Sequence, residues 1–405
     1  MINLEIPKKF VPLVGQAHQV AEEVFRPISR KYDVAEHAYP KELDMLAALI
    51  DGMNDGSDLG GAGAAGVRRT DGDGTDSVRN GSNMSTVLGI VELCWGDVGL
   101  LLSMPRQGLG NSAIASVAND EQLERFRGKW AAMAITEPEA GSDSAAIRTT
   151  AVYDEATGEY VLNGEKIYVT SGERADLVVV WATLDRNVGR AAIKSFVVER
   201  SNPGLKLDRL EHKLGIRASD TAAFILDDCR VPRENLLGSP EVDTSKGFGG
   251  VMQTFDNTRP LVAGMAVGLT RACLELTNRL LAEAGVEVDY DKPAASQSAA
   301  AAEYLAMEAD YEAARLLTLE AAWMADNSKP NSLQASMAKA KAGRTCVDVA
   351  LRCVRLCGSL GYSEELLLEK WARDAKILDL FEGTQQIQLL IIARQLLGKS
   401  SAELK

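Results

Sequence analysis

Residues 160–170 read YVLNGEKIYVT, and residues 177–181 read LVVVW. Both stretches are rich in the β-branched and aromatic residues that favour strands, and the second is a continuous apolar run of strand length. The dipeptide Asn163-Gly164 favours a tight turn, because both of its residues tolerate positive φ. The sequence therefore predicts a hairpin in which Asn163-Gly164 joins strands at Tyr160–Leu162 and Lys166–Thr170.

The strand signals continue on the C-terminal side of this stretch. Short β-prone runs at Ser195–Val198 and Phe224–Leu226 are separated by turn residues that include Pro203-Gly204. Several short strands at close spacing are typical of a compact barrel or sandwich. We therefore expect a middle β domain over residues 131–240.

Helical patterns flank this β domain on both sides. In residues 1–130, apolar residues recur at helical spacing near 13–24 and 45–49, and a further helix is expected over 85–101. Between them, residues 51–76 are dense in Gly, Asp and Ala, which predicts a loop.

Residues 241–405 return to helix. Residues 298–326 contain neither Gly nor Pro and predict one long helix. A second helix is expected over 384–397, with Gly398 as its C-cap. The order of helices, β domain and helices indicates an α+β multidomain protein, with a crevice at the domain interface where a cofactor is commonly bound.

Composition excludes several classes of protein. The chain has 405 residues and a formal net charge of −13, which favours two or three domains and argues against a nucleic-acid binder. No apolar run reaches the ~18 residues of a membrane span, and residues 1–30 lack a signal-peptide core. Three histidines and six cysteines without a C-x-x-C pair predict no metal site. The cysteines are expected to be core residues in a reduced compartment, so we expect a cytoplasmic protein.

The same scarcity of histidine argues against a Ser-His-Asp hydrolase. An enzyme of this composition would use a carboxylate base and a cofactor for its difficult chemistry.

Four segments carry residues suited to a site. In the first, residues 134–143 (AITEPEAGSD), Thr136, Ser142 and the backbone N–H groups near Gly141 offer donors for a ring carbonyl or a phosphate. The alternative is a polar turn between domains. In the second, residues 166–172 (KIYVTSG), a strand would present Tyr168 and Thr170 on one face and Val169 on the other. Such a pair could stack against and bond a planar ring, and the alternative is an ordinary half-buried strand.

The third segment is residues 255–260 (FDNTRP), where Asp256 and Arg259 lie three residues apart at an expected helix start with Pro260 in the first turn. They could hold an amide and a phosphate, or they could form a surface ion pair. The fourth segment is residues 380–388 (LFEGTQQIQ). There Glu382 would have a raised pKa through desolvation, which suits a general base, or it could simply favour the helix N-terminus.

In this order and spacing, the four segments resemble the acyl-CoA dehydrogenase family. Two further stretches carry the resemblance, KLGIRASDT at residues 213–221 and WARDAK at residues 371–376. The resemblance spans nearly the whole chain. It implies an N-terminal helical domain, a β-barrel-like middle domain and a C-terminal four-helix bundle, with FAD between the last two and subunits assembled as dimers of dimers.

The resemblance also implies an activity. Members of this family convert an acyl-CoA thioester to the trans-2-enoyl-CoA. A glutamate removes the α proton while the β hydride goes to flavin N5, and electrons then pass to an electron-transfer flavoprotein. The backbone N–H of the glutamate and a ribityl hydroxyl of FAD polarise the thioester carbonyl. Of the family's two positions for the base, one matches Glu382 and the other matches Thr258, which cannot act as a base.

Further roles are carried over position by position from the family. The flavin ring would be lined by Ile135, Thr136, Tyr168, Val169 and Thr170. Ser142 would reach the pantetheine or the flavin phosphates, and Thr384 and Gln386 the diphosphate and adenosine side of FAD. Residues expected beside the substrate and its CoA group are Phe255, Asp256, Arg259, Phe381 and Gly383.

Two features of homotetrameric relatives are missing. A neighbour's flavin is contacted in those relatives by an Arg-x-x-Phe-Gly loop, but residues 284–293 read AGVEVDYDKP. A second contact, Gln-x-x-Gly-Gly-x-Gly, is replaced by RLCGSLG at residues 355–361. The paired loss predicts a hetero-oligomer in which a related subunit supplies the missing contacts. The alternatives are a homo-oligomer with altered FAD contacts, a non-catalytic partner subunit, and an oxidase or an enzyme of carrier-protein thioesters.

Overall fold

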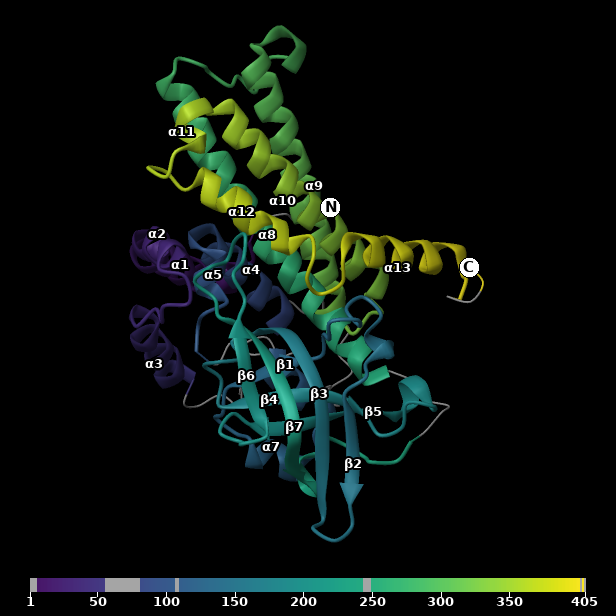
Figure 1. Ribbon diagram of the computed structural model, residues 1–405. Helices are drawn as coiled ribbons and strands as arrows, with labels where there is room; N and C mark the ends of the chain where they lie inside the picture. The colour runs from purple at the N-terminus through teal and green to yellow at the C-terminus, as the bar shows by residue number, and fades with distance from the viewer. Residues whose placement is uncertain (1–5, 55–80, 106–108, 243–248, 401–402, 404–405) are drawn as a thin grey trace.

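The computed structural model describes residues 6–54, 81–105, 109–242, 249–400 and 403, without the side chains of 49–54 and 249–257 (Figure 1). Its N-terminal part is helical. The main helices there are α1 Val11–Val20, α2 Arg26–Val34, α3 Glu42–Asn54, α4 Ser82–Gly96, α5 Val98–Leu101, α6 Leu109–Val117 and α7 Asp120–Arg125. Most of the loop predicted for residues 51–76 lies outside the described residues, and α3 extends to Asn54.

The single helix expected over residues 85–101 is two helices, so that prediction was wrong in part. Asp97 separates α4 from α5 with an extended backbone. Its carboxylate accepts a hydrogen bond from the backbone N–H of Leu100 at 2.8 Å and therefore caps α5. The sequence pattern did not predict this break, because one polar residue does not interrupt the helical spacing of the apolar residues around it.

The middle of the chain forms one curled sheet of seven strands. The strands are β1 Ala131–Ala134, β2 Thr150–Asp154, β3 Glu159–Thr170, β4 Leu177–Thr183, β5 Ile193–Glu199, β6 Leu205–Leu210 and β7 Thr221–Pro232. Their order is β1-β4-β2-β3-β7-β6, and β5 pairs with β4. Every residue of β4 is buried, with Val178 and Val180 in one core and Val179 and Trp181 in another. The apolar run at residues 177–181 is therefore a central strand covered on both faces.

The predicted hairpin at Asn163-Gly164 is wrong. β3 runs straight through this dipeptide, which forms a bulge opposite β7, and the turn lies earlier, where Asp154 of β2 pairs with Glu159 of β3. Asn163 is bonded to Asp228 on β7 instead of closing a turn. A Cβ on Gly164 would lie 2.5 Å from Thr149 Oγ1, so glycine is needed there for close backbone approach.

The C-terminal part is a helical bundle, built from α8 Gly249–Glu283, α9 Ala299–Asp326, α10 Ser332–Leu356 and α12 Leu368–Leu378, with a short α11 Gly358–Tyr362. The last helix, α13 Gln385–Leu397, packs on α10 near its start and extends away from the bundle in Figure 1. Residues Thr258–Glu283 of α8 are apolar enough to cross a membrane, but 78% of the most apolar window is buried inside the protein. This helix is therefore a core helix.

α8 also corrects an expectation about the third segment. Arg259 and Pro260 do not lie at a helix start, because α8 begins at Gly249 and Pro260 is inside it. Proline inside a helix removes one intrahelical hydrogen bond and favours a bend. Pro260 directly follows Thr258 and Arg259, both of which are buried.

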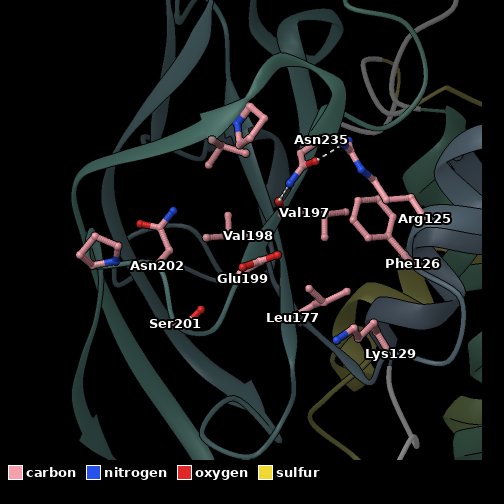
Figure 2. Close-up of a pocket in the computed structure, with 13 residues that line it drawn as sticks. Arg125, Phe126, Lys129, Leu177, Val197, Val198, Glu199, Ser201, Asn202 and Asn235 are labelled. Atoms are coloured by element: carbon pink, nitrogen blue, oxygen red, sulfur yellow. Dashed lines mark hydrogen bonds between the residues drawn. The ribbon is translucent and has the colours of Figure 1, made fainter. Parts of the chain in front are cut away.

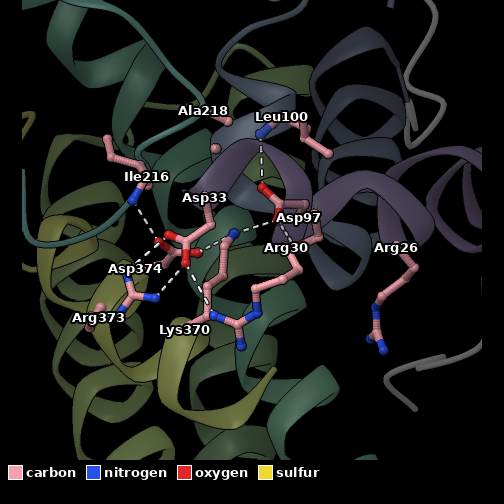
Figure 3. Close-up of polar contacts among 12 residues, drawn as sticks. Arg26, Arg30, Asp33, Asp97, Leu100, Ile216, Ala218, Lys370, Arg373 and Asp374 are labelled. Atoms are coloured by element: carbon pink, nitrogen blue, oxygen red, sulfur yellow. Dashed lines mark hydrogen bonds and ion pairs between the residues drawn. The ribbon is translucent and has the colours of Figure 1, made fainter. Parts of the chain in front are cut away.

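The N-terminal helices and the C-terminal bundle share one hydrophobic core, which includes Phe25, Leu100, Leu269 and Trp371. A buried ion network ties the β domain to both (Figure 3). The Lys370 ammonium of α12 bonds to Asp97 and lies 2.6 Å from Asp374. Asp374 in turn accepts the backbone N–H of Ile216, from the loop between β6 and β7, at 2.5 Å. Residues from all three parts of the chain therefore meet at one buried lysine.

Candidate active site

The segment between α12 and α13, which we call the Glu382 turn (residues 379–384), holds the predicted base. Glu382 has φ 55° and Gly383 has φ 90°, so both lie in the left-handed region. That conformation is strained for a glutamate and is typical of functional sites. Thr384 then caps α13, since its hydroxyl accepts the backbone N–H of Ile387. The sequence prediction of a helix directly after this turn is confirmed.

The Glu382 carboxylate is bonded to helix α8 of the bundle. Its Oε2 accepts a hydrogen bond from the Thr258 hydroxyl of α8 at 2.7 Å. Burial raises the pKa of Glu382 above its ordinary value, and the Thr258 hydroxyl, Arg259 and Lys339 act in the opposite direction. A partly desolvated carboxylate with adjacent cations suits proton abstraction near neutral pH.

Two side chains that were not singled out in the sequence hold the Glu382 turn. Lys339 of α10 is fully buried, and its Nζ donates to the Gly383 carbonyl at 2.7 Å. Gln388 of α13, also fully buried, donates from Nε2 to the carbonyls of Glu382 at 3.0 Å and Gly383 at 3.1 Å. In the sequence, Lys339 is marked only by its position among the small residues of α10.

The β domain contributes a second group of predicted site residues. Ile135 and Thr136 follow β1, and their backbone is fixed from β3: Lys166 Nζ donates to the Ile135 carbonyl at 3.0 Å, and the Ile167 N–H donates to Thr136. Lys166 is fully buried and forms an ion pair with Glu137 at 2.7 Å. Burial lowers the pKa of Lys166 to about 8, while Glu137 opposes this effect. This buried pair was missed because nothing in the sequence relates its two members.

Tyr168 presents its ring outward from β3. The strand has a register shift between Lys166 and Val169, and Tyr168 has φ 57° there. Its side chain is 61% exposed, whereas Val169 is fully buried in the β core. The predicted opposite faces of these two residues are therefore confirmed, and Val169 can offer a ligand its backbone only. Thr170 is partly buried.

The remaining predicted residues fall into three groups. Ser142 and Gln386 are exposed. Phe381 lies in the Glu382 turn, and Arg259 is 2% exposed on α8. The side chains of Phe255 and Asp256 lie outside those that the structure describes.

The structure also has a surface cavity and a group of metal-ligating side chains away from these residues. Figure 2 shows an open cavity of about 420 Å³ against β5, where Arg125 donates to Asn235 at 3.0 Å. None of the predicted site residues lines it. Glu36, His37 and His212 each place a metal-ligating atom within 4.8 Å of the others. The Glu36 carboxylate already lies 2.9 Å from Nδ1 of His212 and accepts a hydrogen bond from the Lys213 N–H, so the group joins the chain after α2 to the loop after β6.

Comparison with known proteins gives matches over most of the chain. The family model "Acyl-CoA dehydrogenase, middle domain" matches residues 132–229, and "Acyl-CoA dehydrogenase, C-terminal domain" matches residues 245–397. The mouse mitochondrial short-chain specific acyl-CoA dehydrogenase is 32% identical over 98% of this chain and 92% of its own. The acryloyl-CoA reductase (NADH) of Anaerotignum propionicum is 31% identical over 95% of this chain and 93% of its own.

A solved structure gives the same result. Butyryl-CoA dehydrogenase from Megasphaera elsdenii has a TM-score of 0.81 and 28% identity, covering 98% of this chain and all of the other. The fold and the sequence matches therefore agree along the whole length.

Proposed function

Because this chain belongs to the acyl-CoA dehydrogenase family, an FAD-dependent group of oxidoreductases, we propose that Glu382 is its catalytic base. The reaction proposed is removal of two hydrogens from the α and β carbons of an acyl-CoA, giving the trans-2-enoyl-CoA. The observation that carries this proposal is the geometry of Glu382: a strained turn directs a carboxylate of raised pKa into the bundle.

The proton chemistry follows from the site. The α proton of a thioester is too weakly acidic for an exposed carboxylate, so the base must be desolvated and the carbonyl polarised. We propose that Glu382 takes the α proton and that its own backbone N–H donates to the thioester carbonyl. FAD, when bound, supplies the acceptor for the hydrogen that leaves the β carbon.

The residues present fit a flavin. Tyr168 offers an exposed aromatic ring on a strained bulge, and the carbonyls of Ile135 and Thr136 are held by hydrogen bonds from Lys166 and Ile167, which precede it on β3. At the start of α13, Gln385 Oε1 is buried and has no hydrogen-bond partner among the described residues. A helix N-terminus favours phosphate. We propose that Ile135, Thr136, Tyr168, Thr170 and the Val169 backbone line the ring, and that Ser142, Thr384 and Gln386 reach the phosphates and adenosine.

The thioester is proposed to lie beside Arg259, Phe381 and Gly383, with Phe255 and Asp256 on the preceding turns of α8. Arg259 is buried next to the base and would favour the anionic character of the enolate and the CoA group. The length and branching of the acyl chain are left open by this assignment. Electron-transfer flavoprotein is the acceptor that the resemblance implies, and lipid β-oxidation in the cytoplasm is the setting we propose.

We further propose that the working enzyme is a hetero-oligomer. Arg355, which stands where homotetrameric relatives have the flavin-contacting Gln, is bound to Glu303 of α9. In the acidic loop after α8, Asp289 is paired with Lys292 and Tyr290 donates to Glu308. These side chains are therefore engaged within the chain. A homologous partner would supply the contacts that this chain lacks.

Helix α13 supports assembly of some kind. Four of its leucines, Leu389, Leu390, Leu396 and Leu397, are at least half exposed. Exposed large apolar residues gathered on one helix mark an interaction surface. The same observations favour, as a second candidate, a partner-dependent or non-catalytic subunit. The strained and supported Glu382 turn argues for the catalytic role.

The test of the base is Glu382→Gln, which keeps the size of the side chain and removes its basicity. We expect turnover of acyl-CoA to fall by about 10²–10⁴, with flavin content unchanged. The matched control is Glu312→Gln on α9, whose carboxylate forms a surface ion pair with Arg315. Turnover of Glu382→Gln within twofold of this control would refute the assignment.

The test of assembly is to purify the chain alone and record its visible absorbance and its mass in solution. We expect substoichiometric flavin, which a co-expressed homologous chain restores together with activity. A homodimer or homotetramer with one FAD per chain would overturn the hetero-oligomer proposal and leave the role of Glu382 intact.

A further inference from the structure

Lys339 is a buried cation in an apolar helix. It lies on α10 among Ala335, Ala338 and Ala342, and its side chain is 0% exposed. Burying a charge is costly unless it is paired. No described carboxylate forms an ion pair with Lys339, whereas the other two fully buried lysines, Lys166 and Lys370, each have one. The partner of Lys339 is instead the Gly383 carbonyl.

We propose that Lys339 is a positioning residue for Glu382, which fixes the Glu382 turn through the Gly383 carbonyl and stabilises the ionised carboxylate by its charge. This inference rests on the proposed function of Glu382 as the base. It assigns Lys339 no contact with substrate or cofactor.

The Glu382 turn has a strained backbone that needs support. Glu382 and Gly383 both have positive φ, and a conformation of this kind persists only where surrounding groups hold it. The Gly383 carbonyl accepts two donors, Lys339 from α10 and Gln388 from α13. A Cβ on Gly383 would lie 2.4 Å from Gln388 Nε2, so the turn packs closely against this side chain of α13. Lys339 supports the same carbonyl from α10.

The electrostatic part concerns the charges that face Glu382. Arg259 acts on Glu382 from α8 and Lys339 from α10. Asp379, the first residue of the turn, acts on Lys339 and is paired with Lys376 at 3.1 Å. Thr258 adds a neutral donor at 2.7 Å. Lys339 has no ion-pair partner of its own among the described residues, and its charge acts on the carboxylates of both Asp379 and Glu382. Burial lowers the pKa of Lys339 to about 8, so the ammonium is charged below about pH 8, which includes the acidic range in which the carboxylate of Glu382 ionises.

The experiment uses the flavin-loaded enzyme, with its partner chain if flavin loading requires one. Three variants separate the two parts: Lys339→Met removes the bond and the charge, Lys339→Gln keeps a donor without charge, and Lys339→Arg keeps the charge. The control is Lys341→Met, the same change two residues along α10, where Lys341 pairs with Asp310 on α9. The readouts are exchange of the acyl-CoA α proton in D₂O without an electron acceptor, and kcat/KM against pH.

For Lys339→Met we expect α-proton exchange at pH 6.5 to fall at least about tenfold relative to Lys341→Met, with KM within about twofold and the acid limb of kcat/KM at higher pH. Lys339→Gln should move the acid limb in the same direction, and Lys339→Arg should leave it in place. The Gln and Arg variants decide the matter if Lys339→Met does not fold.

The inference would be overturned if Lys339→Met or Lys339→Gln had the same acid limb and the same exchange rate as Lys341→Met. Failure of the proposed function looks different. In that case Glu382→Gln itself would exchange the α proton at the wild-type rate, whatever the Lys339 variants do.

Discussion

As the proposed base, Glu382 has to be buried enough to take up a weakly acidic proton and still be ionised. The structure meets both demands with a few neighbours: burial raises the pKa of Glu382, and the Thr258 hydroxyl, Arg259 and Lys339 limit the increase. The protonation of the proposed base therefore depends on side chains from α8 and α10 as much as on the turn that carries it.

Thr258→Val removes the hydroxyl that favours the ionised carboxylate. The pKa of Glu382 should rise further, so the acid limb of kcat/KM should move to higher pH. A hydrogen bond to a charged group contributes about 1.5–3 kcal/mol, so kcat/KM at acidic pH should fall by about tenfold or more. Thr270→Val is the control, because Thr270 is also buried on α8 but bonds to the carbonyl of Ala266. Equal profiles for the two variants would contradict the role of Thr258.

Glu382→Gln should stabilise the protein at neutral pH. The pKa of Glu382 is raised on folding, so the ionised carboxylate costs folding free energy above the folded pKa, and this cost is absent below about pH 4.3, where the unfolded chain is also protonated. We expect a gain of about 0.5–2 kcal/mol at pH 7.5 that vanishes near pH 4, measured by urea unfolding.

Glu137→Gln provides a contrast of opposite sign. Burial raises the pKa of Glu137, but the ion pair with Lys166 and the hydrogen bonds that Glu137 accepts lower it by more, so the pKa is below its ordinary value. That variant should lose stability at neutral pH and approach the wild type as the pH falls. If both variants changed the free energy of unfolding in the same direction at neutral pH, the opposite pKa shifts of Glu382 and Glu137 would be contradicted.

At the scale of elements, α8 is the helix on which the N-terminal helices rest. A Cβ on Gly268 would lie 2.2 Å from the Val91 carbonyl of α4, whereas a Cβ on Gly264, one turn earlier, would make ordinary contacts at 3.5 Å. We expect Gly268→Ala to lose about 1–3 kcal/mol of stability and Gly264→Ala to be neutral or to gain up to about 1 kcal/mol from helix propensity. Urea unfolding of the two variants checks this, and equal effects would contradict the close approach of α4.

The elements also show how far sequence reasoning extends. Long segments with a clear period were predicted well: α9 begins directly after Ser298, and α13 ends at Leu397 with Gly398, φ 62°, as its C-cap. Asn163-Gly164 was misread because a bulge and a hairpin use the same dipeptide, and only the pairing of β3 with β7 distinguishes them. Glu382 was predicted as the base from its segment and stays a prediction, whereas the contacts of Lys339 and Gln388 with the Glu382 turn were not predicted, since they depend on packing between helices.

At the scale of the whole molecule, Lys370 joins the three parts of the chain. Asp97 and Asp374 hold the pKa of Lys370 above its ordinary value even though burial acts against this. Lys370→Met would leave two buried carboxylates without their cation, and we expect a loss of about 3–5 kcal/mol. Lys206→Met, at an exposed pair with Asp227, should cost less than about 1 kcal/mol. A loss below 1 kcal/mol for Lys370→Met, by urea unfolding, would contradict this role.

The core shared by the first and last helical regions has a consequence for how the chain is made. The N-terminal residues of that core end at Met104, and the C-terminal ones begin at Ala263. About 160 residues must therefore leave the ribosome before the first helices meet their partners, a delay of about 8–30 s at ordinary rates of synthesis. Throughout that interval the apolar faces of the N-terminal helices lack their final cover, so the nascent chain is a natural client for chaperones.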